Sequence, residues 1–168
     1  MKALLIIPPE RFRDEEYLQT KEELEEAHIG TVTASKYPAV SIGMLGGKVT
    51  PGMTLDHVDL TAYDAVVFIG GGGSVVYFNN PQALDIARKA DAAGKVVAAI
   101  CIAPSILANA GVLNGKRATA SASEADNLRA KGAEYTGELV TIDGRIVTGI
   151  GPKASKEFGK AVAKALGK

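Results

Sequence analysis

The sequence predicts an α/β fold in which helices sandwich a doubly wound, mostly parallel sheet. Three observations predict this fold. The apolar runs at residues 3–7 and 65–69 are unbroken, which is typical of parallel strands buried on both faces. Such runs alternate with helix-like segments, for example residues 81–93, which end at Gly94. Near the C-terminus, Asp143-Gly144 lies between two β-like runs and predicts an antiparallel hairpin.

The elements expected in the first half follow from their composition. Prolines stop the first strand after residue 7, and an acidic start predicts a weakly amphipathic helix over 14–28. β-forming residues predict a short strand at 31–34. Residues 40–49 contain two glycines and are interpreted as a hairpin or flap appended to the sheet. Residues 60–63 lead into the buried strand at 65–69, and the helix at 81–93 follows.

The second half continues the alternation of strands and helices. A buried strand is expected at 95–100, followed by a helix with Pro104 in its first turn. The remaining expected elements are a strand at 116–119, a helix at 123–131, hairpin strands at 139–142 and 145–148, and a helix at 154–166. Residues 1–168 show no linker or repeat and are expected to form a single domain, with ligands binding at the carboxyl ends of the strands.

The bulk composition excludes several classes of partner. Nineteen basic and 19 acidic residues balance, so the sequence predicts no binding to nucleic acid or to an anionic membrane. No apolar run approaches the length of a membrane span. A single cysteine cannot form a disulfide within the chain, and the expected location is the cytoplasm. Two histidines and one cysteine make no zinc pattern, and we expect neither a metal nor a cofactor.

Cys101, the only cysteine, stands where an apolar strand must turn sharply into a helix. The small residues Ala99 and Ala103 flank it at the spacing of a nucleophile elbow. A thiol held there faces outward near amides at a helix N-terminus, which favour the thiolate. We therefore expect an acidic, reactive thiol; the alternative is a small buried hydrophobic residue.

A run of glycines, Gly70-Gly71-Gly72-Gly73, directly follows a buried strand. It fits neither nucleotide-binding pattern, because no Lys-Ser or Lys-Thr follows and Val75 and Val76 replace a required glycine. The run is interpreted either as close backbone packing or as a source of amide donors for a developing negative charge.

Several of these landmarks together resemble the ThiJ/PfpI superfamily. They are Tyr63-Asp64-Ala65-Val66-Val67 before Gly70-Gly71, the Ala99-Ile100-Cys101 elbow, and Ala110-Gly111-Val112-Leu113-Asn114-Gly115-Lys116. The similarity covers nearly the whole chain. It implies a flavodoxin-like fold, related to class I glutamine amidotransferases, and a homo-oligomer of two or more subunits, in which the 40–49 hairpin is a candidate interface.

The resemblance also assigns roles to residues. Amides of Gly71, Gly72 and Ile102 are expected to form an oxyanion hole beside the nucleophile Cys101. The segment Phe12-x-Asp14-x-Glu16 matches a pattern whose last glutamate approaches the sulfur, so Glu16 is expected to be a protonated hydrogen-bond partner of the thiolate. Glu15 takes this place if the register shifts by one, and the acidic run alternatively serves only as a helix start.

Histidine is where the chain departs from these relatives. The position after the cysteine is Ile102, and the loop position that holds a histidine in another branch is Ser121, a candidate lining residue. We expect His28 at a helix end and His57 on the surface, neither within reach of the cysteine of its own subunit.

The function that the resemblance implies is cysteine chemistry on a small-molecule or protein-adduct substrate. It is either addition to a reactive carbonyl such as methylglyoxal, of the glyoxalase or deglycase type, or hydrolysis. Peptidase activity is disfavoured because Ile102 cannot act as a base. One alternative is a redox-sensing, stress-protective protein whose Cys101 is oxidised reversibly without substrate turnover. Another is a homologue that keeps the fold without activity.

Overall fold

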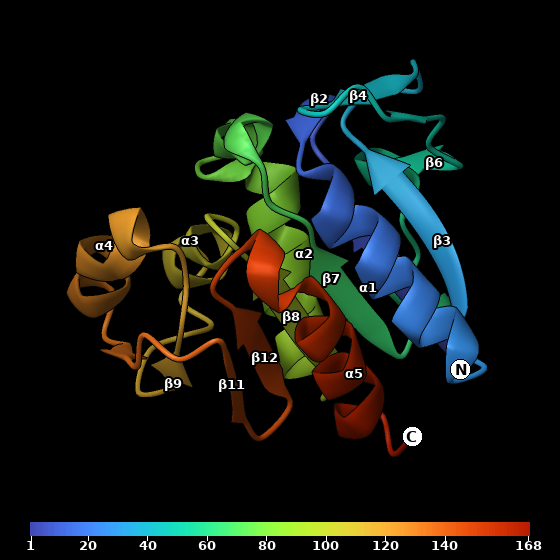
Figure 1. The fold of residues 1–168 in the computed structure, drawn as a ribbon. Helices are drawn as coiled ribbons and strands as arrows, with labels where there is room; N and C mark the ends of the chain where they lie inside the picture. The colour runs from blue at the N-terminus through green and yellow to red at the C-terminus, as the bar shows by residue number, and fades with distance from the viewer.

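The computed structural model describes residues 1–168, and a seven-stranded sheet runs through its centre (Figure 1). The spatial order is β11-β12-β8-β7-β1-β3-β6, and every neighbouring pair is parallel except β11 and β12. The strands of this sheet are β1 (Lys2–Ile6), β3 (Gly30–Ser35), β6 (Met53–Thr54), β7 (Ala65–Phe68), β8 (Val96–Ile100), β11 (Val140–Asp143) and β12 (Ile146–Gly149). The predicted doubly wound α/β fold with a C-terminal antiparallel hairpin is confirmed.

Helices cover both faces of this sheet, as Figure 1 shows. They are α1 (Asp14–Glu26), α2 (Pro81–Ala92), α3 (Pro104–Asn109), α4 (Ala125–Ala130) and α5 (Ser155–Ala165). Alternate residues of β1 enter two separate apolar cores: Leu4 and Ile6 pack toward α2 and α3, whereas Ala3 and Leu5 pack toward α1 and α5. This division explains why the strand is apolar at every position rather than at every second one.

Two helix ends can be traced to particular residues. Asn80 caps α2 by accepting a hydrogen bond from the amide of Ala83 at 2.9 Å, and Pro81 occupies the first turn. Helix α1 ends at Glu26 rather than at residue 28, because His28 has a positive φ of 62° that no helix accommodates.

A second, three-stranded sheet differs from expectation. Residues 40–49 form the antiparallel hairpin β4 (Ser41–Gly43) and β5 (Lys48–Val49), but this hairpin pairs with β2 (Glu10–Phe12) and not with the main sheet. The buried carboxylate of Asp14 accepts hydrogen bonds from the amides of Leu45 (2.7 Å) and Gly47 (2.8 Å). The start of α1 therefore fastens this flap, defined as residues 40–49, above the carboxyl ends of the strands.

Smaller elements complete the chain. The expected strand at 116–119 is the shorter β9 (Arg117–Ala118), which pairs in parallel with β10 (Glu134–Tyr135) in a sheet of its own. Short 3-10 helices occur at five places: η1 (Leu55–His57), η2 (Leu60–Ala62), η3 (Gly72–Tyr77), η4 (Ala122–Glu124) and η5 (Pro152–Ala154).

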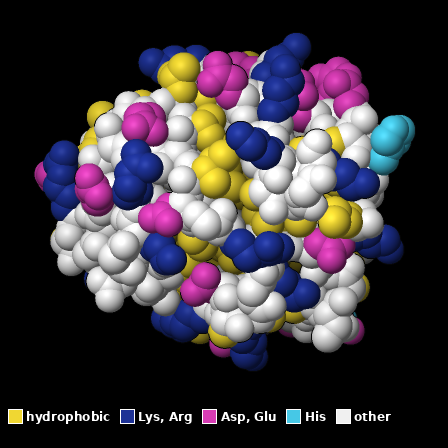
Figure 2. Space-filling view, turned by 90° about the horizontal axis from the view of Figure 1, so that it is seen from below, with side chains coloured by type: hydrophobic (Ala, Val, Ile, Leu, Met, Phe, Trp, Pro, Cys, Tyr) yellow, Lys and Arg dark blue, Asp and Glu magenta, His cyan; other side chains and the backbone are white.

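The surface carries mixed charge. On the face seen from below in Figure 2, basic and acidic side chains alternate around a band of apolar atoms, and neither sign gathers into a large patch. No helix has both the length and the apolar character required to cross a membrane.

Candidate functional site

Cys101 lies at the carboxyl end of β8 in a strained elbow. Its φ is +67°, a left-handed conformation that a residue with a side chain rarely adopts. The elbow is held by hydrogen bonds from the Cys101 amide to the carbonyl of Gly149 (3.0 Å) and from the Ser121 amide to the Cys101 carbonyl (2.8 Å). The flanking Ala99 and Ala103 are completely buried, so the tight turn requires their small size. The backbone of the elbow therefore fixes the position of the half-buried Cys101 thiol.

Glu16, in the first turn of α1, is the acidic side chain that meets this elbow. It is 0% exposed, and neither carboxyl oxygen has a hydrogen-bond partner of normal geometry. A Cβ placed on Gly70 would lie 2.6 Å from both Glu16 Oε1 and Cys101 Cβ. Only a glycine at position 70 therefore leaves room for the carboxyl and the cysteine to lie together here. A buried carboxyl without a hydrogen bond of normal geometry is rare in native proteins, which makes Glu16 a candidate for a functional role.

The remaining glycines of the loop pack against residues 10–13. The amide of Arg13 donates to the carbonyl of Gly70 at 3.0 Å. Side chains on Gly71 and Gly73 would collide with the backbone of Arg11 and Glu10, and Gly71 also has a φ of +103°. Close packing therefore explains why these positions are glycine. The same packing fixes the orientation of the backbone amides of the loop.

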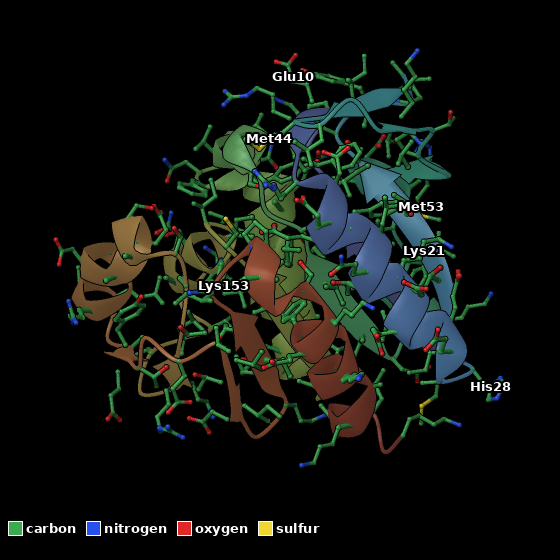
Figure 3. The ribbon with its side chains drawn as sticks, viewed as in Figure 1. Glu10, Lys21, His28, Met44, Met53 and Lys153 are labelled. Carbon is green, nitrogen blue, oxygen red and sulfur yellow. The ribbon has the colours of Figure 1, made fainter.

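The amides of the loop differ in their direction. Those of Gly71 and Ile102 act on the Cys101 sulfur as hydrogen-bond donors and lower its pKa. The amide of Gly72 instead donates to the sulfur of Met44 on the flap, at 3.4 Å, and Figure 3 shows Met44 above this loop. An oxyanion role for Gly72 requires that thioether to move, and the role stays a prediction.

Burial sets the protonation state of Glu16. It raises the pKa of this carboxyl to about 8, while nearby hydrogen-bond donors, the Cys101 thiol first among them, lower it. At pH 7 Glu16 therefore mostly holds its proton, which agrees with the expectation from the sequence.

The surroundings of Cys101 oppose the acidic thiol that the sequence predicts. Burial raises the pKa of Cys101 to about 12, and an ionised Glu16 adds to the rise by like-charge repulsion. The amides of Gly71 and Ile102 oppose this effect but do not outweigh it. The helix that follows begins only at Pro104 and has six residues, so its dipole is small. The thiol therefore has to lose its proton when it reacts, and Glu16 is the adjacent carboxyl that can exchange protons with it near neutral pH.

Alkylation of Cys101 is expected to follow this raised pKa. The rate with iodoacetamide should keep rising from about pH 7 to beyond about pH 9, because the reactive thiolate stays a minor species throughout. Mass spectrometry of the Cys101 peptide at timed intervals measures the rate. A plateau below about pH 8 would show instead that the amide donors dominate.

The other predicted residues divide into near and distant ones. Glu15 forms a two-pronged ion pair with Arg13 (2.8 and 3.1 Å), so Glu16 and not Glu15 faces the sulfur. Ser121 reaches the site through its amide. His57 is exposed beside Asp56, and His28 lies at the far end of α1 in Figure 3. Neither histidine approaches Cys101 within the subunit.

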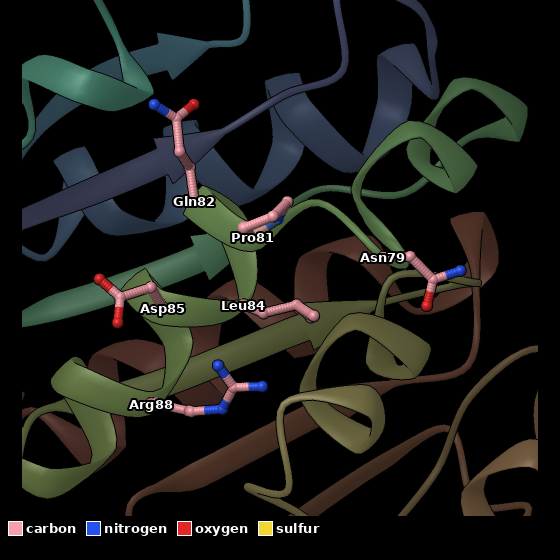
Figure 4. A pocket seen from close by; sticks show the side chains of 6 residues that line it. All are labelled: Asn79, Pro81, Gln82, Leu84, Asp85 and Arg88. Atoms are coloured by element: carbon pink, nitrogen blue, oxygen red, sulfur yellow. The ribbon is translucent and has the colours of Figure 1, made fainter.

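No deep cavity opens onto Cys101. The largest surface depression, about 580 Å³, lies at the start of α2 and contains none of the predicted site residues (Figure 4). It is lined by Asn79, Pro81, Gln82, Leu84, Asp85 and Arg88. Three smaller depressions also lie away from the cysteine. Within a single subunit, therefore, none of these depressions encloses a ligand at the cysteine.

Sequence reasoning missed two parts of the site. Strand β2, which brings Arg11 and Arg13 against the glycine loop, has only three residues and a register shift, so no periodicity marks it. The contact of Met44 with Gly72 joins residues 28 positions apart. The run of consecutive glycines was the one available signal, since it indicates that another backbone approaches closely.

Comparisons with known proteins identify relatives of this chain. The model of the DJ-1/PfpI family matches residues 1–165. An uncharacterized protein of Methanocaldococcus jannaschii is 37% identical over 99% of this chain and 83% of its own length. Deglycase PfpI of Pyrococcus furiosus is 33% identical over 86% of this chain and 87% of its own length. The crystal structure of a ThiJ/PfpI domain protein from Brachyspira murdochii has a TM-score of 0.97 at 31% identity, covering 99% of this chain and 96% of that one.

Proposed function

The chain belongs to the DJ-1/PfpI family, and from this premise we propose that it uses Cys101 to add to reactive carbonyl compounds, as a deglycase-like or glyoxalase-like enzyme. The observation that carries the proposal is the completely buried, unpartnered carboxyl of Glu16 beside the strained cysteine elbow. Archaeal relatives named deglycases support this choice of chemistry.

The protonation states fit a proton transfer that is coupled to attack. Burial raises the pKa of both the Cys101 thiol and the Glu16 carboxyl, and a carboxyl with a pKa of about 8 can both give and take a proton near neutral pH. As the carbon–sulfur bond forms, the protonated Glu16 gives its proton to the former carbonyl oxygen and takes the thiol proton on its other carboxyl oxygen. The product is a hemithioacetal, and Glu16 ends in the protonation state in which it began.

The loop amides supply the electrostatic part. Negative charge leaves the sulfur during attack and appears on the substrate oxygen, so donors near the sulfur stabilise both ends of the step. We assign this role to the amides of Gly71 and Ile102, because both act on the Cys101 sulfur. For methylglyoxal, a further proton shift between the two carbonyl-derived carbons yields a lactoyl thioester. Water then cleaves this thioester to lactate and restores the thiol.

Proteolysis fits the site poorly. A cysteine peptidase must protonate a leaving amine, and the residue after the cysteine is Ile102, which has no proton to give. We include carbonyl adducts on the side chains of other proteins among the proposed substrates, because relatives are named deglycases.

A direct assay tests the proposal. Purified protein is incubated with methylglyoxal, and both aldehyde loss and lactate formation are followed, with Cys101→Ser as the control. Turnover that disappears in the control supports the proposal. Absence of turnover, together with reversible oxidation of Cys101 by dilute peroxide, would favour the redox-sensing alternative.

A further inference from the structure

Arg11 adopts an unusual conformation in the middle of β2. Its φ is +56°, in the left-handed region that arginine rarely occupies, and the pairing of β2 with β4 shifts register at this point. Such backbone strain persists only where neighbouring structure imposes it, and it is concentrated at functional sites. With this backbone conformation, the side chain of Arg11 leaves the regular alternation of a strand and lies against the glycine loop.

The guanidinium of Arg11 lies against Gly72. A Cβ on Gly72 would be 2.6 Å from Nη2, 3.0 Å from Cζ and 3.5 Å from Nη1, so the whole planar group covers this glycine. Gly72 directly follows Gly71, whose amide acts on the Cys101 sulfur. The cation therefore sits on the loop that supplies the amide donors of the site.

No acidic group neutralises this cation. The neighbouring Arg13 is paired with Glu15, but Arg11 takes part in none of the ion pairs of the molecule and its side chain donates no hydrogen bond. Arg11 is exposed to solvent. A planar, unpaired guanidinium is the group best suited to bind a carboxylate through two parallel hydrogen bonds.

We propose that Arg11 binds a carboxylate carried next to the reactive carbonyl of the substrate, so that the site prefers 2-oxo acids and aldehyde acids to neutral carbonyl compounds. This inference rests on the proposed function, because it assumes that Cys101 adds to a carbonyl. The covalent step needs no oxidant: sulfur bonds to the carbonyl carbon, and the thiol proton ends on the former carbonyl oxygen.

The test measures protection of Cys101, not turnover. Glyoxylate carries a carboxylate on its aldehyde carbon, and methylglyoxal is a neutral aldehyde of similar size. Each is added at increasing concentration, and the residual rate of alkylation by neutral iodoacetamide gives the concentration for half-protection. The ratio of the two concentrations is compared among wild type, Arg11→Gln, Arg11→Lys and Arg145→Gln. Arg145 is an exposed, unpaired arginine at the opposite end of the sheet, so its variant controls for net charge.

Arg11→Gln is expected to raise the half-protection concentration of glyoxylate about tenfold and to change that of methylglyoxal less than about twofold. Arg11→Lys should give an intermediate value for glyoxylate, and Arg145→Gln should match wild type. An unchanged ratio in Arg11→Gln, with methylglyoxal still protecting, overturns this inference and leaves the proposed function intact. Failure of both aldehydes to protect the wild-type protein overturns the proposed function and the inference with it.

Discussion

Glu16→Gln is expected to lower turnover of a reactive carbonyl by about 100-fold or more, while leaving Cys101 at least as reactive toward iodoacetamide above about pH 9. Turnover needs a group that accepts and returns the thiol proton, and an amide does neither. Simple alkylation needs only the thiolate, and removing the carboxylate removes the repulsion that raises the pKa of the Cys101 thiol. Parallel measurement of the two rates across pH separates these effects. An equal fall in the turnover and alkylation rates would mean that Glu16 has a structural role and transfers no proton.

Folding stability provides the control for this variant. The pKa of Glu16 is 4.5 when exposed and about 8 in the folded protein, so the folded state holds a proton that the unfolded state has lost. The stabilisation linked to this proton is fully present below pH 4.5 and disappears as pH rises through about 8. Glu16→Gln removes this dependence. Urea unfolding at several pH values should therefore show the variant gaining stability relative to wild type between those limits.

The fold could be predicted largely because its signals are local. Strands β1, β7 and β8 are buried on both faces, so each forms an unbroken apolar run, and Asp143-Gly144 marks the hairpin by turn chemistry alone. Pairing of β4 with β2 was not predictable in the same way. It depends on a three-residue strand and on the carboxylate of Asp14, more than 25 residues from the flap amides that it binds.

The site shows the same division between local and distant causes. Small residues around Cys101 marked the elbow, and the structure has the positive φ that an elbow requires. The protonation of the pair was predicted only in part, since burial depends on what α1 and the glycine loop place over the sulfur. Amide donors and a helix start were visible in the sequence; the desolvation that outweighs them was not.

Gly70→Ala is expected to destabilise the protein by about 3 kcal/mol, which corresponds to a fall in Tm of about 6–12 °C for a domain of this size. The added methyl group would lie 2.6 Å from Cys101 Cβ, Glu16 Oε1 and the carbonyl oxygen of Ile100. Ile100 is fixed in the central sheet and Cys101 by its elbow, so Glu16 must give way, and turnover should fall with stability. Thermal unfolding and the methylglyoxal assay measure the two effects.

Gly151→Ala is the matched control for that substitution. A methyl group on Gly151 meets nothing within 4 Å, and the backbone there is extended, so the change in stability should stay within about 0.5 kcal/mol. The difference in stability between the two variants measures the effect of the steric clash at Gly70, separate from the general effect of replacing a glycine with alanine. If Gly70→Ala unfolded at the same temperature as Gly151→Ala, the close packing of Gly70 against Cys101, Glu16 and Ile100 would be contradicted, and with it the placement of Glu16 on which its assignment as the base rests. If Gly70→Ala lost turnover and also alkylated at the wild-type rate, the displaced group would be the base and not the nucleophile.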